Sequence, residues 1–165
     1  MKKNICLFLI VLVWSAISAF AGNKVYKATD FGIVPNTGKS QSALMQKVID
    51  AIRAEMKKGD KAVLVLEKGR YDFHPADASK RNYYVSNHDQ PQPRPVGIAL
   101  EDMHDLTFDG QGAELVFHGR MMPMSLVRSG NCTLKNFSID FANPQISQIT
   151  IVESDAEKGI TFKPA

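Results

Sequence analysis

The side chains best suited to binding a ligand lie together in one proline-rich segment, residues 82–95. Its aromatic and polar residues include Tyr83, Tyr84, His88, Asp89 and Arg94. The alternating prolines of QPQPRP predict an extended, irregular loop, because proline fixes φ and disfavours helix at the residue before it. Loops that concentrate aromatic and polar groups often form binding surfaces, whereas others are solvated connections. We therefore expect these residues either to contact a ligand or to brace the loop.

Carboxylates are the next candidates, since paired acids could perform acid–base chemistry. Six deserve consideration: Asp89, Glu101, Asp102, Asp105, Asp109 and Asp140. Glu101 and Asp102 are adjacent, so on a strand they would point to opposite faces and would not converge on one bond. Asp105 and Asp109 lie beside expected corners, where aspartate is a typical turn residue. Asp140 alternates with apolar neighbours and is expected to face outward, where it either lines a groove for a sugar or is solvated.

The remaining reactive residues predict neither a metal nor an organic cofactor. The four histidines, at positions 74, 88, 104 and 118, are too widely spaced to match the ligand pattern of a zinc site. Cys132 is expected to be a small buried hydrophobic residue and not a nucleophile. The short Gly110-x-Gly112 pattern lacks the third glycine and the following helix of a dinucleotide site. With 20 basic and 17 acidic residues, the charge balance is too even to suggest nucleic-acid binding.

The first 21 residues are typical of a secretory signal peptide. Lys2 and Lys3 precede an uninterrupted apolar run, 5–14, and the segment closes on Ala19-Phe20-Ala21. The apolar run is too short for an ordinary membrane-spanning helix, which needs about 20 residues. We expect cleavage after Ala21, a mature chain of residues 22–165 without a membrane span, and export to the periplasm, the cell surface or the medium.

The elements that must position the candidate residues begin with one helix. Leu44, Val48, Ala51, Ile52 and Met56 recur at spacings of three and four and predict an amphipathic helix from Ser42 to Met56. Strands are expected at 25–31, 62–66 and 70–74. Beyond residue 95 the sequence predicts further short strands, at 98–100, 106–108, 115–117, 126–127, 133–134, 138–141 and 148–152. The methionines at 121, 122 and 124, around Pro123, are expected to pack flexibly at the edge of a loop.

An internal repeat relates two parts of the strand-rich region. When the sequence is shifted along itself by 26 residues, Leu100 aligns with Leu126, residues 105–108 with 131–134, and Gly110 with Asn136. A repeat of this length built from short strands predicts a β-solenoid, whose open end needs a cap. The single amphipathic helix precedes the first coil, where such a cap belongs. Residues 109–112 (DGQG) predict a tight corner, and Asn131 and Asn136 are expected to bond nearby backbone groups at similar corners.

Three segments together resemble glycoside hydrolase family 110, exported bacterial α-1,3-galactosidases. They are Tyr83–Gln90 (YYVSNHDQ), Leu106–Gly112 (LTFDGQG) and Asn136–Phe141 (NFSIDF) followed by Pro144. The opening DFGI at residues 30–33, followed by a turn and a helix, is similar to the start of other exported β-helix polysaccharide enzymes. The resemblance covers about residues 27–165, and members of the family are several times longer. The chain is therefore similar to the N-terminal portion of such an enzyme.

The resemblance implies a mainly β fold, a right-handed parallel β-helix fragment with an N-terminal capping α-helix. It implies exo-acting, inverting release of terminal α-1,3-linked galactose from blood-group B type glycans, branched or linear, and catalytic aspartates beyond residue 165. No catalytic residue is therefore assigned, and the piece in hand is expected to be inactive alone. The candidates for contact with the glycan are Tyr83, Tyr84, His88, Asp89, Arg94 and Asp140. A β-helix polysaccharide lyase and a noncatalytic adhesin or glycan-binding surface protein are the alternatives.

Overall fold

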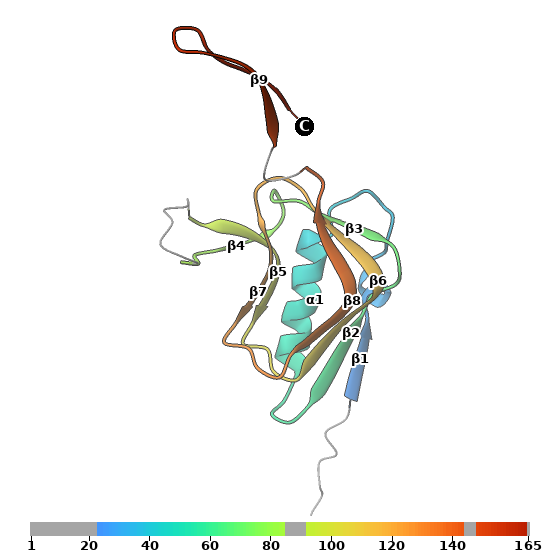
Figure 1. Cartoon of the computed structure of the whole chain (residues 1–165). Coiled ribbons are helices and arrows are strands. Elements are labelled where there is room, and N and C mark those ends of the chain that lie inside the picture. The colour runs from blue at the N-terminus through green and yellow to red at the C-terminus, as the bar shows by residue number, and fades with distance from the viewer. Residues whose placement is uncertain (1–22, 85–91, 144–147, 165) are drawn as a thin grey trace, which may run out of the picture.

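The computed structural model describes residues 23–84, 92–143 and 148–164 (Figure 1). The expected signal peptide, His88 and Asp89 lie outside these residues. The described part is mainly β and has one α-helix, α1 (Ser42–Glu55), and a short 3₁₀ helix at Ala28–Phe31. The strands are β1 (Asn23–Lys27), β2 (Lys61–Val65), β3 (Arg70–Phe73), β4 (Ser79–Arg81), β5 (Arg94–Glu101), β6 (Leu106–Phe117), β7 (Met122–Val127), β8 (Thr133–Phe141), β9 (Ile149–Asp155) and β10 (Gly159–Pro164).

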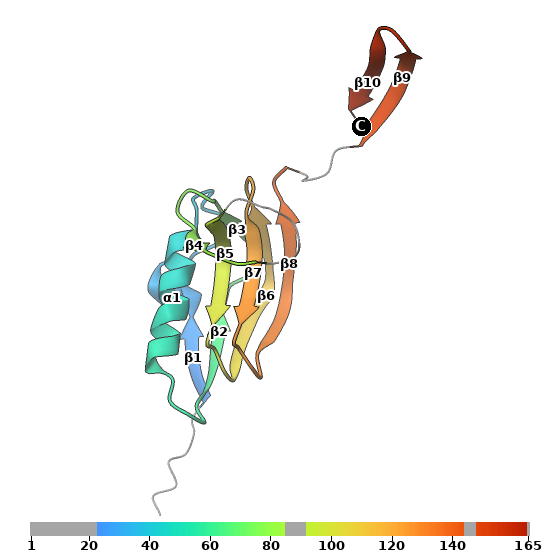
Figure 2. The same ribbon diagram turned by 90° about the vertical axis from the view of Figure 1, so that its left-hand side faces the viewer.

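Two sheets face each other across the core, and α1 lies at one end of both (Figures 1 and 2). In the first sheet β1, β2, β6 and β8 pair in parallel, and β3 pairs with the second half of β6. In the second sheet β5 pairs in parallel with β7 and antiparallel with β4. The chain passes from β5 to β6, then to β7 and β8, so it alternates between the two sheets. In Figure 2, β8 lies at the end opposite α1.

The strand pairings follow the offset of the internal repeat. Leu100 pairs with Leu126, and Thr107 and Phe108 pair with Thr133 and Leu134, all at the offset seen in the sequence. Beyond the middle of β6 the offset becomes shorter by two positions, as in the pairing of Phe117 with Phe141. The repeat detected in the sequence is therefore the register in which successive strands pair.

A bend in β6 causes this change of register. It was expected at residues 109–112, where Gln111 and Gly112 indeed have φ values of 50° and 87°. Gly110 serves a different purpose, since a Cβ there would lie 2.7 Å from the carbonyl oxygen of Asn136 on the neighbouring strand. The segments on either side, predicted as separate strands, form one bent strand, and the same holds for β8.

Asn131 and Asn136 have positive φ at their corners, as expected, but their amides bond different partners from those predicted. Each donates to a carboxylate one strand away: Asn131 to Asp105 at 2.8 Å and Asn136 to Asp109 at 2.9 Å. The prediction of backbone partners was wrong because parallel pairing places the corner residues of successive strands beside each other.

The helix was predicted almost to the residue, but its buried face was predicted only in part. Val48 and Ile52 are buried as expected, together with Met45 and Ile49, whereas Leu44 is only partly buried. The buried stripe is therefore rotated toward the side that packs against β5 and the 3₁₀ helix. The spacing of three and four fits both stripes, and only the packing partner selects one.

Three other expectations are corrected by the strands. Residues 28–31 form the 3₁₀ helix and do not extend β1. Met122 and Met124 belong to β7, not to a loop edge. The expected loop over residues 82–95 is flanked by β4 and ends in β5, so Arg94 and Pro95 are strand residues in an antiparallel hairpin. In the last two cases strand pairing overrides the local pattern.

β9 and β10 form an antiparallel hairpin that pairs with no other described strand. It projects from the two-sheet body beyond the end of β8 (Figure 2). The prediction placed a strand at residues 148–152, which overlaps this hairpin and not the parallel stack. Elsewhere the core is well packed: Tyr71, Phe73, Phe108 and Phe117 are no more than 1% exposed. In the described residues α1 is too short and too polar to cross a bilayer.

Candidate functional site

The aromatic and polar residues predicted to contact a ligand lie on the hairpin formed by β4 and the start of β5. Arg81 pairs with Arg94, and the chain between them carries Tyr83 and Tyr84. The Gln92 side chain reinforces the hairpin, because its amide nitrogen donates to the Tyr83 carbonyl at 2.6 Å and its oxygen accepts from the Tyr83 N–H at 3.2 Å. The hairpin projects from the edge of the second sheet (Figure 1). Three of the six predicted candidates are thus brought onto one element.

The Tyr83 hydroxyl is fixed against the outer side of β5 and β7. It donates a hydrogen bond of 2.5 Å to Oε1 of Glu101 and accepts one from the Ser125 hydroxyl at 3.3 Å. Arg81 holds the other oxygen of Glu101, at 2.9 Å from its Nε. We call these four residues, Arg81, Tyr83, Glu101 and Ser125, the hairpin corner.

The electrostatics of the hairpin corner keep Glu101 ionised. Burial alone would raise its pKa, but the hydrogen bonds from Tyr83 and Arg81 outweigh burial and lower the pKa. Burial and the hydrogen bond to Glu101 raise the pKa of Tyr83, so the phenol remains a donor. With both carboxylate oxygens engaged, Glu101 orients Tyr83 and Arg81. It is unsuited to donate a proton as a general acid, which requires a raised pKa.

Two side chains beside the hairpin corner have binding capacity to spare. Tyr84 is 90% exposed, so its ring is open to a flat apolar surface such as the face of a sugar. The Nε of Arg94 is buried and has no hydrogen-bond partner among the described residues. A buried, unpaired donor is costly, and a ligand oxygen would satisfy it only if the groups that shield this nitrogen moved aside. The arrangement can therefore bind and orient a polar ligand, but its carboxylate is committed to structure.

Sequence reasoning missed Arg81 and Ser125. It considered Glu101 only as a catalytic carboxylate, set that role aside, and assigned Glu101 no structural role. Arg81 and Glu101 are far apart in the chain, and so are Ser125 and Tyr83. The repeat could have found Ser125, since its offset places Ser125 beside Ala99, on the same outer side of the sheet as Glu101. No local pattern indicated Arg81.

Asp140, the sixth predicted candidate, lies on the other sheet, apart from the hairpin corner. It is exposed, as its alternation predicted, and stands in register with Val116 of β6 and, beyond it, Asp72 of β3. Asp72 is 6% exposed at its side chain, accepts hydrogen bonds from Arg70 at 2.8 and 3.0 Å, and lies 2.8 Å from Nε2 of His118. Burial would raise the pKa of Asp72, but these partners lower it.

His118 also stacks on His74, with ring centroids 3.9 Å apart and planes 10° from parallel. The two histidines follow Phe117 and Phe73, which pair across β6 and β3 and stack in the same way inside the core. The polar row Asp72–His118 therefore fixes the end of the sheet. Its acid is an ionised partner of Arg70 and does not resemble a proton donor.

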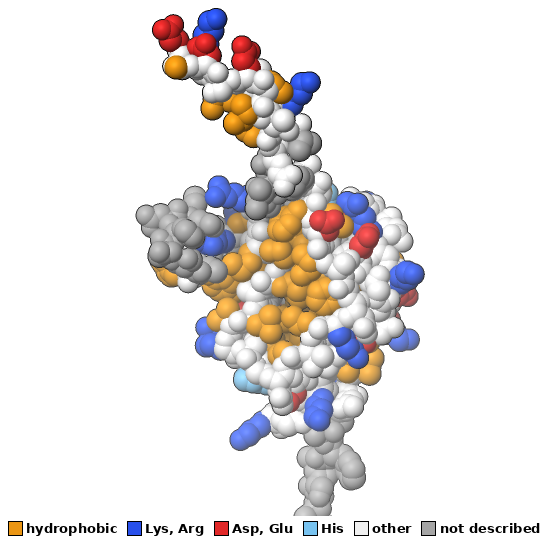
Figure 3. All heavy atoms as spheres, viewed as in Figure 1, with side chains coloured by type: hydrophobic (Ala, Val, Ile, Leu, Met, Phe, Trp, Pro, Cys, Tyr) orange, Lys and Arg blue, Asp and Glu red, His pale blue; other side chains and the backbone are white. Residues whose placement is uncertain are grey.

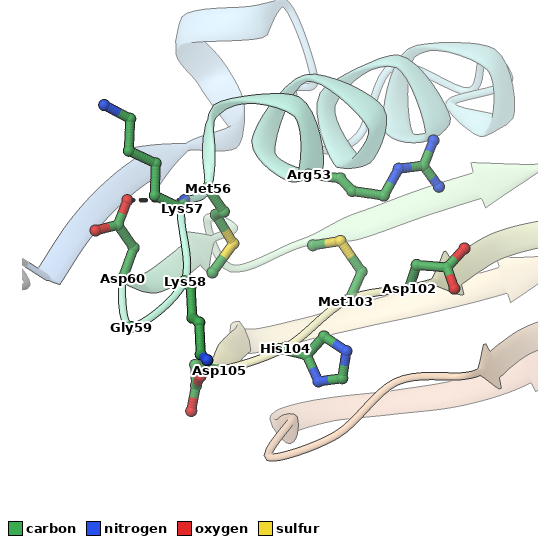
Figure 4. A pocket seen from close by; sticks show the side chains of 10 residues that line it. All are labelled: Arg53, Met56, Lys57, Lys58, Gly59, Asp60, Asp102, Met103, His104 and Asp105. Carbon is green, nitrogen blue, oxygen red and sulfur yellow. Dashed lines mark hydrogen bonds between the residues drawn. The ribbon is translucent and has the colours of Figure 1, made fainter.

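A hollow of about 400 Å³ lies between the turn after α1 and the turn after β5 (Figure 4). The side chains of Met56 and Met103 face each other there. Its carboxylates have partners: Asp60 pairs with Lys24 at 3.1 Å, Asp102 with Arg128 at 2.6 Å, and Asp105 accepts from Asn131. None of the predicted contact residues that the structure describes lines it.

Cys132 is only partly buried, and its thiol lies 3.5 Å from the carbonyl oxygens of Met103 and Gly130. The repeat aligns Cys132 with Leu106, and these two residues immediately precede the paired residues Thr133 and Thr107. Within residues 23–84, 92–143 and 148–164, no cluster of His, Cys, Asp or Glu side chains is arranged to hold a metal ion.

Comparison with known proteins gives relatives that are named alpha-1,3-galactosidases. No protein-family model matches the chain. The whole chain is 54% identical over 165 residues to "Alpha-1,3-galactosidase B" of Phocaeicola vulgatus, and covers 27% of that protein. It is 52% identical to the protein of the same name in Bacteroides fragilis, covering 28% of it. It is 39% identical over 127 residues to "Alpha-1,3-galactosidase A" of Shewanella woodyi, where 77% of this chain matches 20% of that protein. The chain thus spans about a quarter of the length of the first two of these relatives.

Proposed function

This chain is homologous over its whole length to alpha-1,3-galactosidases, as its resemblance to glycoside hydrolase family 110 predicts, and on this premise we propose that the full-length protein is an exo-acting α-1,3-galactosidase. The substrates are glycans of the blood-group B type, branched or linear, that end in α-1,3-linked galactose. The identity of 54% along all 165 residues carries the proposal. The protein needs no metal or organic cofactor for this reaction.

The mechanism we propose is inverting hydrolysis by two carboxyl groups outside this segment. An inverting enzyme holds a proton-donating acid and a water-activating carboxylate about 6.5–9.5 Å apart. The pKa values of Asp72, Glu101, Asp102 and Asp109 are all lowered, and hydrogen-bond donors engage each of these carboxylates. Carboxylates with a lowered pKa and engaged oxygens suit structural roles better than proton donation. The catalytic pair is expected in the three quarters of the relatives' length that the chain does not cover.

The segment's own contribution is contact with the glycan and support for the fold. Tyr84, Arg94 and the hairpin corner are the contact residues that the geometry favours, because they combine an open aromatic ring with an unpaired donor. His88 and Asp89 complete the proposed set from the sequence. Asp140 faces a different side of the molecule, so its contact would require the glycan to reach the first sheet.

The fold we propose for the segment is the start of a right-handed parallel β-helix with α1 as its cap. Parallel pairing at a repeated offset and the alternation of the chain between two sheets support this proposal. We also propose that the protein is exported after cleavage behind Ala21. The mature N-terminus, read by Edman degradation or mass spectrometry, should then be Gly22.

The activity is tested with full-length protein on a linear and a branched glycan ending in α-1,3-galactose. Release of free galactose is expected, with the β-anomer forming first in proton NMR spectra, as inversion requires. An α-anomer formed first would contradict inversion. Unsaturated uronide products from an acidic polysaccharide would favour the lyase alternative, and glycan binding without galactose release would favour the noncatalytic one.

The hairpin's part in binding is tested separately. Tyr84→Ala in the full-length enzyme is expected to raise KM about tenfold with little change in kcat, as loss of roughly 1.4 kcal/mol of ground-state binding would. Tyr84→Phe is the matched control, since it keeps the ring and should leave KM unchanged. Equal KM values for the two variants would exclude stacking by this residue.

A further inference from the structure

The hollow between the turn after α1 and the turn after β5 has the size and the lining of a ligand pocket. Its volume of about 400 Å³ lies within the range of pockets that hold small molecules, about 300–1,000 Å³. The thioether side chains of Met56 and Met103 face each other across it (Figure 4), and Met103 is only 1% exposed. The hollow therefore has an apolar floor.

This hollow is separate from the larger apolar surface of the molecule. Figure 3 shows apolar side chains gathered over β7 and β8, at the end of the stack away from α1. Those side chains pack against the core, and the proposed β-helix accounts for them. The hollow instead lies where α1 meets the stack, and polar side chains from both turns surround its floor. We call these polar side chains the rim.

The rim provides hydrogen-bond donors with unused capacity. Lys58, from the turn after α1, has no hydrogen bond or ion pair within the described part of the chain, and the ring of His104, from the turn after β5, has no hydrogen bond there. Arg53 is fixed at the rim because it donates to the Glu101 carbonyl. Lys57 also lines the hollow, but its side chain points away in Figure 4. Each of the two turns therefore offers one unengaged donor.

The rim also provides acceptors. One oxygen of Asp105 accepts from Asn131 at 2.8 Å, and its other oxygen has no partner among the described residues. Asp60 likewise engages only its Oδ2. Asp102 differs, since Arg128 donates to both of its oxygens. The C-terminal end of α1 lies here as well, where helix carbonyls lack intrahelical donors and carry partial negative charge.

This mixture of charges decides which ligand fits. An anion would meet the unengaged oxygens of Asp60 and Asp105 and the negative end of the helix dipole. A cation would meet Lys58 and Arg53. A neutral polyhydroxy ligand avoids both repulsions, because each of its hydroxyls can donate and accept. A hexopyranose ring also has an apolar face of C–H groups, which the adaptable methionine floor can contact.

We propose that the hollow is an accessory binding site for one neutral hexopyranose unit of a glycan, separate from the hairpin corner. The inference extends the proposed function and rests on it for the choice of a sugar over other neutral polyols. Hydrogen bonds from the Lys57 N–H and from Arg128 lower the pKa values of Asp60 and Asp102 respectively, so neither acid suits proton donation. The site therefore binds sugar without hydrolysing it.

Methionine methyl NMR on the full-length protein tests the proposal. The ε-methyl groups are labelled with carbon-13, the signals of Met56 and Met103 are assigned with the volume-conserving variants Met56→Leu and Met103→Leu, and methyl α-galactoside is titrated into the wild type. Both signals should shift and saturate with a Kd of about 1 to 10 mM, as a single sugar ring allows. Met122, on β7 and outside the hollow, should not shift. No shift at Met56 and Met103 up to about 100 mM would overturn the proposal.

Charged sugars test the ligand class. Glucuronate and protonated glucosamine are similar in size to the neutral sugar, but each meets like charges at the rim. Each should bind about twofold to fivefold more weakly, as expected for exposed charges. Equal or tighter binding of either sugar, measured by the same two methyl signals, would contradict the choice of a neutral ligand.

Substitution of the rim gives a matched comparison. Lys58→Ala should raise the Kd for methyl α-galactoside about twofold to tenfold, through loss of one hydrogen bond. Lys47→Ala is the control, since Lys47 is exposed on α1 and does not line the hollow. Equal Kd values for the two variants would contradict the role of the rim. Galactose release is measured in parallel: release without a methyl response counts against this site alone, and a methyl response without release counts against the proposed function alone.

Discussion

The two ends of the stack differ in whether the outermost strands are covered. At one end α1 covers β5, and the Gln46 side chain bonds both the N–H and the carbonyl of Ala99, at 3.1 and 3.2 Å. Arg53 bonds the Glu101 carbonyl at 3.2 Å. At the other end Leu126 and Ile139 remain about half exposed. In this protein the helix therefore covers the edge of β5 with both apolar surface and hydrogen bonds.

The strongest test of this comparison is one substitution made at both ends. Ile52 is fully buried in α1, so Ile52→Ala in the chain of this sequence should cost about 2 to 5 kcal/mol in the free energy of unfolding. Ile139→Ala should cost less than about 1 kcal/mol there, because much of its side chain already meets water. Urea denaturation measures both. Equal losses would mean that the two ends are not distinguished by burial.

The next effect concerns the edge hydrogen bonds. Gln46→Met keeps the length of the side chain but leaves the N–H and carbonyl of Ala99 without their partner, and should cost about 2 to 3 kcal/mol. The control is Gln111→Met, on an exposed residue of the β6 bend. If Gln46→Met is neutral in urea denaturation, the helix closes the sheet by apolar contact alone.

A smaller effect concerns Asp72 and Asp140, the two ends of a row of three residues in register across β3, β6 and β8, with Val116 between them. Asp72→Asn weakens the bonds to Arg70 and His118 and should cost about 1 to 2 kcal/mol at pH 7, whereas Asp140→Asn, at the exposed end of the row, should change nothing measurable. The pKa of Asp72 is lowered in the folded state, so its stabilisation is present above the unfolded value of about 3.9 and is lost as pH falls through the folded pKa.

Denaturation curves at a series of pH values check that sign. The difference in unfolding free energy between wild type and Asp72→Asn should be constant near neutrality and shrink below about pH 4. A difference that instead grows on acidification would show that the carboxyl is not held ionised by Arg70 and His118.

The smallest effect is expected where β1 meets the end of α1. Tyr26 donates to Glu55 at 2.9 Å, and burial together with this carboxylate raises its pKa to about 12. Tyr26→Phe should cost about 0.5 to 1 kcal/mol. Because the folded pKa is raised, this contribution is complete below about pH 10 and disappears as pH rises through about 12. Ultraviolet titration of tyrosinate, with the exposed Tyr84→Phe as control, measures the shift.

Much of the fold followed from local pattern and from the repeat. Helix α1 was predicted to within one position at its C-terminus, and the pairing of Leu100 with Leu126 was implicit in the alignment. The buried face of the helix was predicted only in part. Met45 and Ile49 are buried because β5 and the 3₁₀ helix lie on that side. Of the candidate site, the aromatic residues were found, but Arg81 and Ser125 were not.

The sequence by itself determined which segments repeat, where the helix begins, and that Asp140 faces outward. These features depend only on the periods of a repeat, of a helix and of a strand along one chain. The tertiary structure alone decided that Glu101 is held by Arg81 and Tyr83, that residues 28–31 leave β1, and which apolar positions are covered. These depend on strands distant in sequence. Hydrogen bonds and burial between such strands outweigh local preference wherever the two disagree.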